Sequence, residues 1–116
     1  MATTCQTEAQ EQAALAAWLD SRGVLWCHPP NEGQRHPAVG RRLRTAGMKR
    51  GVPDVLVFAP APVGGKPVAI ELKRERGGTV HPAQWAWLDG LAACGWDTYV
   101  ARGAAEAISI LTNHGY

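Results

Sequence analysis

Two carboxylates and a lysine are the residues of this sequence whose types and spacing are best suited to chemistry. Glu71 and Lys73 interrupt an apolar run that is typical of a β-strand. Because side chains alternate along a strand, Glu71 and Lys73 share one face of the predicted sheet, and Ile70 and Leu72 share the other. Charges within such a run need compensating partners. Asp54 heads the preceding apolar run, so in a hairpin its carboxylate would approach Glu71 across the ladder.

Two carboxylates at this separation repel each other unless a cation lies between them. Ligation by oxygen alone suits Mg²⁺ or Mn²⁺ better than Zn²⁺. We therefore expect Asp54 and Glu71 to hold such an ion, with water, a substrate phosphate and a backbone carbonyl, for which Leu72 is our candidate, completing the site. Lys73 would orient or deprotonate the attacking water, or hold a phosphate oxygen. The alternative is a plain ion pair between Glu71 and Lys73 on an exposed sheet face.

A basic segment precedes Asp54. No Asp or Glu lies between Gly33 and Pro53, although the whole chain has a net charge of only +2. Six of the twelve Lys and Arg residues fall in this segment: Arg35, Arg41, Arg42, Arg44, Lys49 and Arg50. Clustered cations of this kind bind phosphate groups, so these six are our candidates for DNA contacts. A solvated basic helix and loop is the alternative.

The pattern of apolar, Gly and Pro residues predicts an α/β fold in the order α-β-β-β-α-β-α. The expected elements are a helix over 7–22, a strand over 24–28, a loop containing a helix over 37–44, strands over 54–58 and 67–73, a helix over 82–94, a strand over 96–101 and a helix over 104–113. The two middle strands should form an antiparallel hairpin. The following strand-helix-strand crossover should be right-handed, which makes its two strands parallel and the four-stranded sheet mixed.

Length and composition limit the class of protein. A chain of 116 residues with 46% hydrophobic residues is the size of one domain, and we expect one stand-alone domain over 1–116. Its uninterrupted apolar runs fall short of the ~18 residues of a membrane span. The N-terminal residues lack the pattern of a secretory signal, so an intracellular protein is expected. Three cysteines without a C-x-x-C motif argue against a disulfide framework and a zinc site.

Two further polar residues each have two interpretations. Glu8 lies between Leu15 and Leu19 on the core-facing stripe of the first helix and could reach the metal site through water. Glu11 is its rival, and either acid could instead simply favour the helix N-terminus. Gln84 occupies the third position of the helix that begins at residue 82, where its side chain can cap backbone amides.

Taken together, these motifs resemble the VRR-NUC (virus-type replication-repair nuclease) branch of the PD-(D/E)XK phosphodiesterases over nearly the whole chain. The matching pieces are Glu8 with Gln12, His28-Pro-Pro-Asn-Glu-Gly-Gln-Arg35, Gly40-Arg-Arg-Leu-Arg-Thr-Ala-Gly47, Gly51-Val-Pro-Asp54, Ile70-Glu-Leu-Lys73 and Pro82-Ala-Gln84. The resemblance implies a restriction-endonuclease-like fold with a four-stranded mixed sheet flanked by helices. It implies catalytic roles for Asp54, Glu71 and Lys73, favours Glu8 over Glu11, and gives Gln84 a supporting role.

The resemblance also implies metal-dependent cleavage of DNA phosphodiester bonds, and stand-alone members resemble homodimeric nucleases that resolve four-way junctions. The sequence thus predicts a Mg²⁺- or Mn²⁺-dependent, structure-specific endonuclease, similar to Holliday junction resolvases, that acts in DNA repair, recombination or replication in a bacterium or phage-infected cell. A nuclease-fold module that binds branched DNA without cutting it is the alternative. A third possibility is a module whose basic loop docks an acidic protein.

Overall fold

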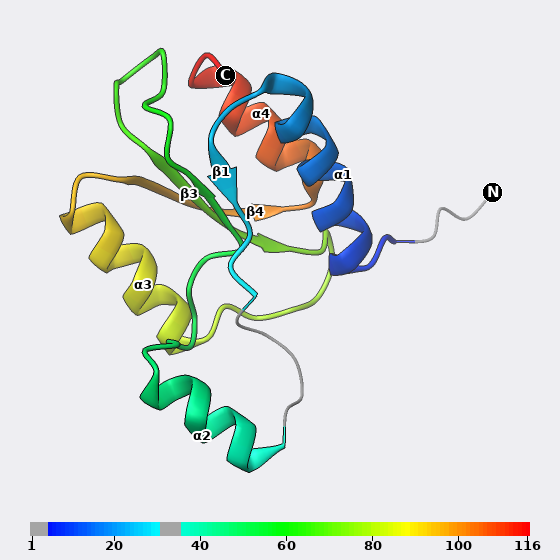
Figure 1. The fold of residues 1–116 in the computed structure, drawn as a ribbon. Helices are drawn as coiled ribbons and strands as arrows, with labels where there is room; N and C mark the ends of the chain where they lie inside the picture. The colour runs from blue at the N-terminus through cyan, green and yellow to red at the C-terminus, as the bar shows by residue number, and fades with distance from the viewer. Residues whose placement is uncertain (1–4, 31–35) are drawn as a thin grey trace.

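A computed structural model describes residues 5–30 and 36–116 of the chain, and Figure 1 shows their fold. The elements within these residues are α1 (Glu8–Arg22), β1 (Trp26–Cys27), α2 (Pro37–Thr45), β2 (Val55–Val57), β3 (Val68–Lys73), α3 (Pro82–Ala93), β4 (Asp97–Arg102) and α4 (Ala104–Asn113). The expected order is confirmed, with α2 as the helix inside the basic loop. No described helix is long and apolar enough to cross a membrane.

The sheet is mixed, as predicted, with strand order β1-β2-β3-β4. β2 pairs antiparallel with both β1 and β3, whereas β3 and β4 are parallel. In the hairpin, Val55 is paired with Ile70. Continuing this register by one residue sets Asp54 opposite Glu71, which is the juxtaposition that the sequence predicts.

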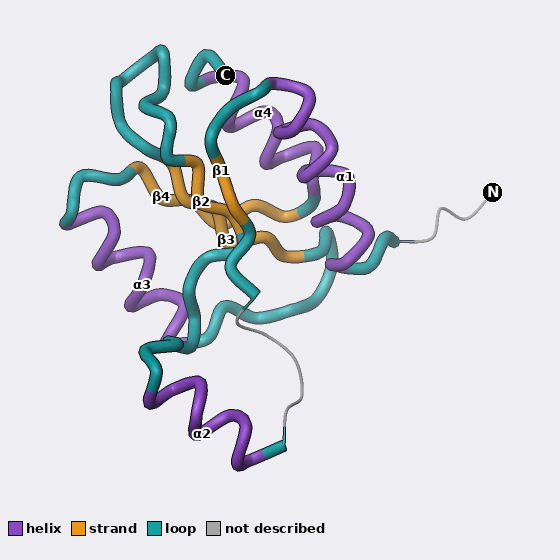
Figure 2. The backbone as a smooth tube through the Cα atoms, in the orientation of Figure 1, coloured by secondary structure: helices purple, strands orange, loops and turns teal. Residues whose placement is uncertain are grey.

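Helices cover both faces of the sheet. Figure 2 shows α1 and α4 on one face and α3 on the other. The main core lies between the sheet and the pair α1 and α4, where Leu15, Leu19 and Leu111 pack against Val55 and Ile70. Because all six residues of β3 are buried, this central strand brings Glu71 and Lys73 into the interior. The alternative of an ion pair on an exposed sheet face is therefore wrong, since helices shield both sides of the sheet.

The first two strands are shorter than predicted. β1 comprises only Trp26–Cys27 instead of 24–28, and β2 only Val55–Val57 instead of 54–58. Beyond this ladder the amides of Phe58 and Ala59 both donate to the carbonyl of Leu25, which ends the regular pairing. Pro29 and Pro30 have no amide proton and prevent the strand from continuing at its other end.

α2 and its flanking loops form an arm, residues 36–50, that stands away from the rest of the molecule (Figure 1). This arm helps to explain a radius of gyration of 14.8 Å, against about 13 Å for a compact chain of this length. Gly51 sets the base of the arm against the start of α3. A Cβ atom there would lie 2.7 Å from the carbonyl carbon of Ala83, and Gly51 has φ +86°, so only glycine fits.

Candidate active site

Asp54 lies directly before β2 and is held from two sides. Its Oδ2 accepts a hydrogen bond from the amide of Leu72 at 2.8 Å. Its main-chain oxygen lies 2.6 Å from Nδ1 of His28, which comes just after β1. Three neighbouring strands of the sheet therefore fix the position of this carboxyl group. Pro53, itself fully buried, precedes it and restricts the local backbone.

Burial raises the pKa of Asp54 above its ordinary value. The Leu72 amide, the neighbouring Glu71 side chain and the charges of His28 and Lys73 oppose this effect on the pKa but do not cancel it. The β2–β3 register sets Asp54 opposite Glu71. Two carboxyl groups this close call for positive charge, either as a proton or as a cation.

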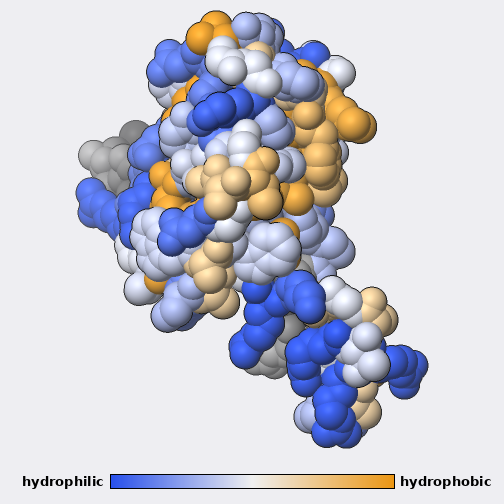
Figure 3. Space-filling model, turned by 90° about the vertical axis from the view of Figure 1, so that its left-hand side faces the viewer, coloured by the Kyte–Doolittle hydropathy of each residue, from blue (hydrophilic) through white to orange (hydrophobic). Residues whose placement is uncertain are grey.

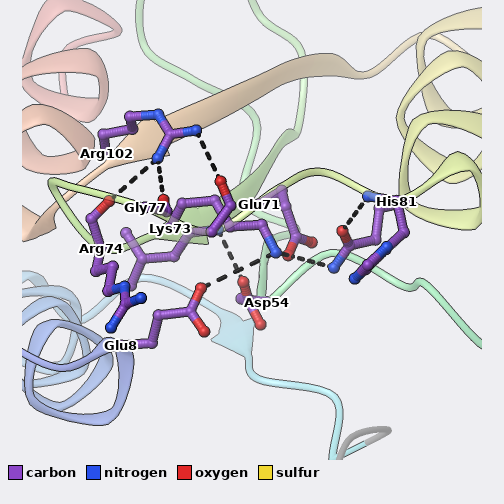
Figure 4. A network of polar contacts seen from close by, with 11 residues as sticks. Glu8, Asp54, Glu71, Lys73, Arg74, Gly77, His81 and Arg102 are labelled. Carbon is purple, nitrogen blue, oxygen red and sulfur yellow. Dashed lines mark hydrogen bonds and ion pairs between the residues drawn. The ribbon is translucent and has the colours of Figure 1, made fainter.

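Glu71 and Lys73 lie in the interior beside Asp54. Glu71 is 1% exposed and Lys73 is 6% exposed, so the alternative of a surface ion pair does not hold. The Lys73 ammonium lies 3.5 Å from Oε1 of Glu71. It lies 3.9 Å from Oε1 of Glu8, which approaches from the first turn of α1 (Figure 4). The lysine is thus held between an acid of the sheet and an acid of a helix.

Gln84 combines the two interpretations that the sequence left open. Its Oε1 accepts a hydrogen bond from the amide of His81 at 2.8 Å and so caps α3. Its Nε2 donates to Oε1 of Glu71 at 2.8 Å. The start of α3 therefore supports the buried acid directly.

The structure separates the two acids of α1. Glu8 is 49% exposed at its side chain and reaches Lys73. Glu11 is buried and accepts a hydrogen bond from the amide of Ala104 at 2.5 Å, which caps the N-terminus of α4. A Cβ atom on Gly103 would lie 2.6 Å from the Glu11 carboxylate, so the cap also depends on that glycine. Glu8 accordingly lies beside the candidate catalytic residues, whereas Glu11 joins two helices.

An arginine fixes the loop that follows Lys73. The guanidinium of Arg102, at the end of β4, donates to the main-chain oxygens of Gly77 at 2.6 Å, Gly78 at 3.2 Å and Arg74 at 3.4 Å (Figure 4). A Cβ atom on Gly78 would lie 3.6 Å from Cδ of Lys73, so this loop folds against the lysine stem. Sequence reasoning missed Arg102, since nothing in its local context connects it with a loop that precedes it by 24 to 28 residues.

The basic arm presents its cations to solvent. Arg41, Arg42, Arg44, Lys49 and Arg50 are all exposed, and the arm forms a strongly hydrophilic projection in Figure 3. The sixth predicted contact, Arg35, lies outside the described residues. Residues 46–53 connect α2 to Asp54, so the chain runs from the cationic arm straight to this acid.

A cavity of about 540 Å³ opens beside these acids. Glu8, Asp54 and Leu72 line it together with His28, Trp26 and residues of α1. His28 and Trp26 were not among the sequence candidates. The only sequence indication for His28 was its place in the motif that precedes the basic segment, and a lone histidine or tryptophan in a short strand carries little information.

The oxygen donors around Asp54 determine which kind of metal ion the site could hold. Among the described residues, no group of three or more His, Cys, Asp and Glu side chains is placed to hold a metal. Asp54 and Glu71 provide two adjoining carboxyl groups, and the neighbouring main-chain carbonyl of Leu72 would be a third oxygen. Mg²⁺ usually keeps several waters and takes one or two protein carboxylates, so these donors suit Mg²⁺ or Mn²⁺. They are too few for a metal ion whose ligands all come from the protein.

A family model described as the VRR-NUC domain matches residues 6–105. The chain belongs to the VRR-NUC family. It is therefore a nuclease domain of the PD-(D/E)XK type, and DNA is its class of substrate. A solved structure described as a VRR_NUC domain protein is similar, with a TM-score of 0.76 and 22% sequence identity over 97% of this chain and 90% of that chain. This likeness supports the fold. A comparison with curated proteins found no match.

Proposed function

We propose that this VRR-NUC domain is a Mg²⁺- or Mn²⁺-dependent DNA endonuclease that cuts branched DNA, in the manner of Holliday junction resolvases, as a homodimer. The adjoining buried carboxyl groups of Asp54 and Glu71, with the Lys73 ammonium 3.5 Å from Glu71, carry this proposal. The exposed cations of the arm support it, since they offer a surface for the DNA backbone.

Asp54, Glu71 and the carbonyl of Leu72 would hold the metal ion. When bound, the ion would act as a Lewis acid toward the scissile phosphate and lower the pKa of a coordinated water. Gln84 holds Glu71 in place through its 2.8 Å hydrogen bond. The amide of Leu72 orients Asp54 in the same way. Both acids are thus fixed before substrate arrives, which reduces the reorganisation needed during the reaction.

Lys73 would orient the attacking water and donate to a phosphate oxygen as negative charge develops. Hydrolysis forms one bond between water oxygen and phosphorus and breaks the bond from phosphorus to the leaving oxygen. The attacking water loses one proton and the leaving oxygen takes up one, so no net proton is consumed. Glu8 acts as a positioning residue, because it holds the Lys73 ammonium from the side of α1. The five described cations of the arm would contact phosphates on one side of the cut.

A cleavage panel tests the proposal. Labelled single strand, duplex, flap and four-way junction are each incubated with Mg²⁺, with Mn²⁺ and with chelator. We expect cutting of branched substrates with either ion and none with chelator. Lys73→Ala should abolish cutting and leave binding nearly intact, whereas Lys66→Ala, which removes an exposed lysine of the β2–β3 loop, should cut normally. Binding without cleavage by the wild-type chain would instead support the non-cleaving module.

A further inference from the structure

The cavity beside the acid pair extends beyond the residues that the proposed reaction uses. Besides Glu8 and Asp54, its lining consists largely of small side chains of α1, namely Ala9, Ala13 and Ala16, and of the Trp26 indole. Its volume of about 540 Å³ lies within the range of sites for small organic groups. A space of this kind next to a phosphodiesterase centre suits a part of the substrate other than the phosphate.

Charge argues against a phosphate in this space. Among the described residues that line the cavity there is no Lys or Arg, whereas two are acids. The cavity therefore offers a phosphate no cationic side chain, whereas the arm offers several. A flat, uncharged group with polar edges matches the lining better.

Gln12 adds a polar group that the fold itself does not use. Gln12 lines the cavity, and neither its side-chain nitrogen nor its oxygen has a hydrogen-bond partner among the described residues, although both atoms are buried. Buried amides are nearly always paired in proteins, so Gln12 has room for a partner from outside the chain, a ligand or a water that a ligand could displace. A glutamine amide offers a donor beside an acceptor, which complements the Watson–Crick edge of any of the four bases.

Trp26 gives the cavity a rigid aromatic wall. The indole Nε1 donates to Oδ1 of Asp20 at 2.8 Å, which fixes the ring from the end of α1. A ring held in this way can stack with a base without losing further conformational freedom. Stacking does not depend on the identity of the base, so this wall would favour DNA structure over sequence.

We propose that this cavity receives an unpaired nucleobase of the cut strand, next to the scissile phosphate, with Trp26 as its stacking surface and Gln12 as its hydrogen-bonding partner. The inference rests on the proposed nuclease function. A paired base is stacked on both sides and its Watson–Crick edge is covered, so only an unpaired or extruded base can enter. The cavity would thereby explain a requirement for branched or distorted DNA.

Two matched substitutions on α1 test the proposal. Ala13→Phe fills the cavity, whereas Ala14→Phe adds the same side chain about 100° further round the helix, outside the cavity lining. Both positions are exposed, so both variants should keep the wild-type melting temperature, and Ala9→Phe is the second cavity-filling variant. We expect Ala13→Phe to lower kcat/KM on a branched substrate by about tenfold and Ala14→Phe to leave it unchanged.

Abasic nucleotides identify the bound base. After the wild-type cut site is mapped, single abasic positions are placed on either side of the cut phosphate. One of them should lower wild-type kcat/KM by about tenfold. It should cause no further loss in Ala13→Phe, because the base is already excluded there, and a smaller loss in Gln12→Leu, which keeps the stacking on Trp26 and has lost only the hydrogen-bonding partner. Equal effects of the two Phe variants, or additive effects of the abasic site and Ala13→Phe, would overturn the base-binding proposal. A wild-type chain that cuts no DNA would overturn the nuclease proposal itself.

Discussion

At the scale of a single residue, the burial of Asp54 affects both the stability of the folded protein and its readiness to bind a cation. Burial raises its pKa, because the charged carboxylate is poorly solvated between the sheet and α1. In the absence of a cation, ionising this group therefore destabilises the folded state. The same feature makes the site ready to take up a cation, which would neutralise the acid pair.

Replacing Asp54 should stabilise the metal-free protein. In the wild type, a raised pKa in the folded state means that stability is lost as pH rises from the ordinary value of 3.8 through the raised value. Asp54→Asn cannot ionise, so at pH 7 in chelator we expect its melting temperature to exceed that of the wild type by roughly 5 °C, the shift that about 1 kcal/mol produces in a domain of this size. Below pH 3.8 the difference should vanish.

Thermal unfolding by circular dichroism across pH 3 to 8 measures this effect. Asp89→Asn, on the exposed face of α3, is the matched control and should show no such pH-dependent gain. A lower melting temperature for Asp54→Asn at pH 7 would mean that the hydrogen bonds to Asp54 outweigh the effect of its burial.

The acid pair and the lysine could be predicted because strand alternation and hairpin pairing are local rules. The choice between Glu8 and Glu11 could not be settled in this way, since both lie in the first turn of one helix. The two acids differ in their long-range contacts, because the first amide of α4 donates a hydrogen bond to Glu11 from 93 residues away. Gln12, Trp26 and His28 acquire their places from the same long-range packing, which no local spacing encodes.

At the scale of elements, Arg102 connects β4 to the loop that leaves β3. Its planar guanidinium donates to three carbonyl oxygens, a geometry that an ammonium group cannot reproduce. Because the loop lies against the Lys73 stem, we expect Arg102→Ala and Arg102→Lys to lower kcat by about tenfold with little change in KM, through misplacement of the lysine.

Limited trypsin digestion provides an independent readout of the loop. Arg74 and Arg76 lie within it and are exposed, so releasing the loop should speed cleavage after these residues in both Arg102 variants. Arg22→Ala, at the end of α1, should leave the digestion pattern of the loop unchanged. A loop that stays resistant in the Arg102 variants would contradict the role assigned to this contact.

The exposed cations of the arm lead to a separate prediction about DNA binding. Removing one phosphate contact should reduce the slope of log affinity against log salt by about 0.9 for duplex regions. We expect this for Arg42→Ala, measured by fluorescence anisotropy with a labelled junction in Ca²⁺ to avoid turnover. Arg22 lies outside the arm, so Arg22→Ala should leave the slope unchanged. An unchanged slope for Arg42→Ala would exclude this arginine from the DNA interface.

The sequence predicted whether a segment is a helix or a strand more accurately than it predicted the residues at which that segment ends. Apolar spacing and caps define α1, where Thr7 and Gln10 form a capping box, and Pro82 with Gln84 defines the start of α3. The lengths of β1 and β2 depend on how Leu25 meets Phe58 and Ala59, which is a tertiary contact. The outward course of α2 was not predictable either, because it depends on the contact of Gly51 with α3.

At the scale of the whole molecule, one chain of 12.4 kDa covers only a short stretch of DNA. Symmetric cuts at a junction are most simply made by two copies related by a two-fold axis. We therefore expect sedimentation equilibrium to give twice the chain mass, with or without junction DNA. If the chain cuts a junction but sediments as a monomer in its presence, the dimer prediction is wrong. The roles proposed for the catalytic residues would be unaffected.

The contact between Glu11 and Ala104 has a consequence for how the protein is made. β2 and β3 are near neighbours in the chain and can pair early, whereas joining α1 to α4 closes a segment of 93 residues and should come late. On the ribosome, α1 emerges before α4 and cannot be locked in place until α4 has followed. Glu8 would then reach Lys73 only after α4 has emerged, so a nascent chain that still lacks α4 should hold an incomplete catalytic site.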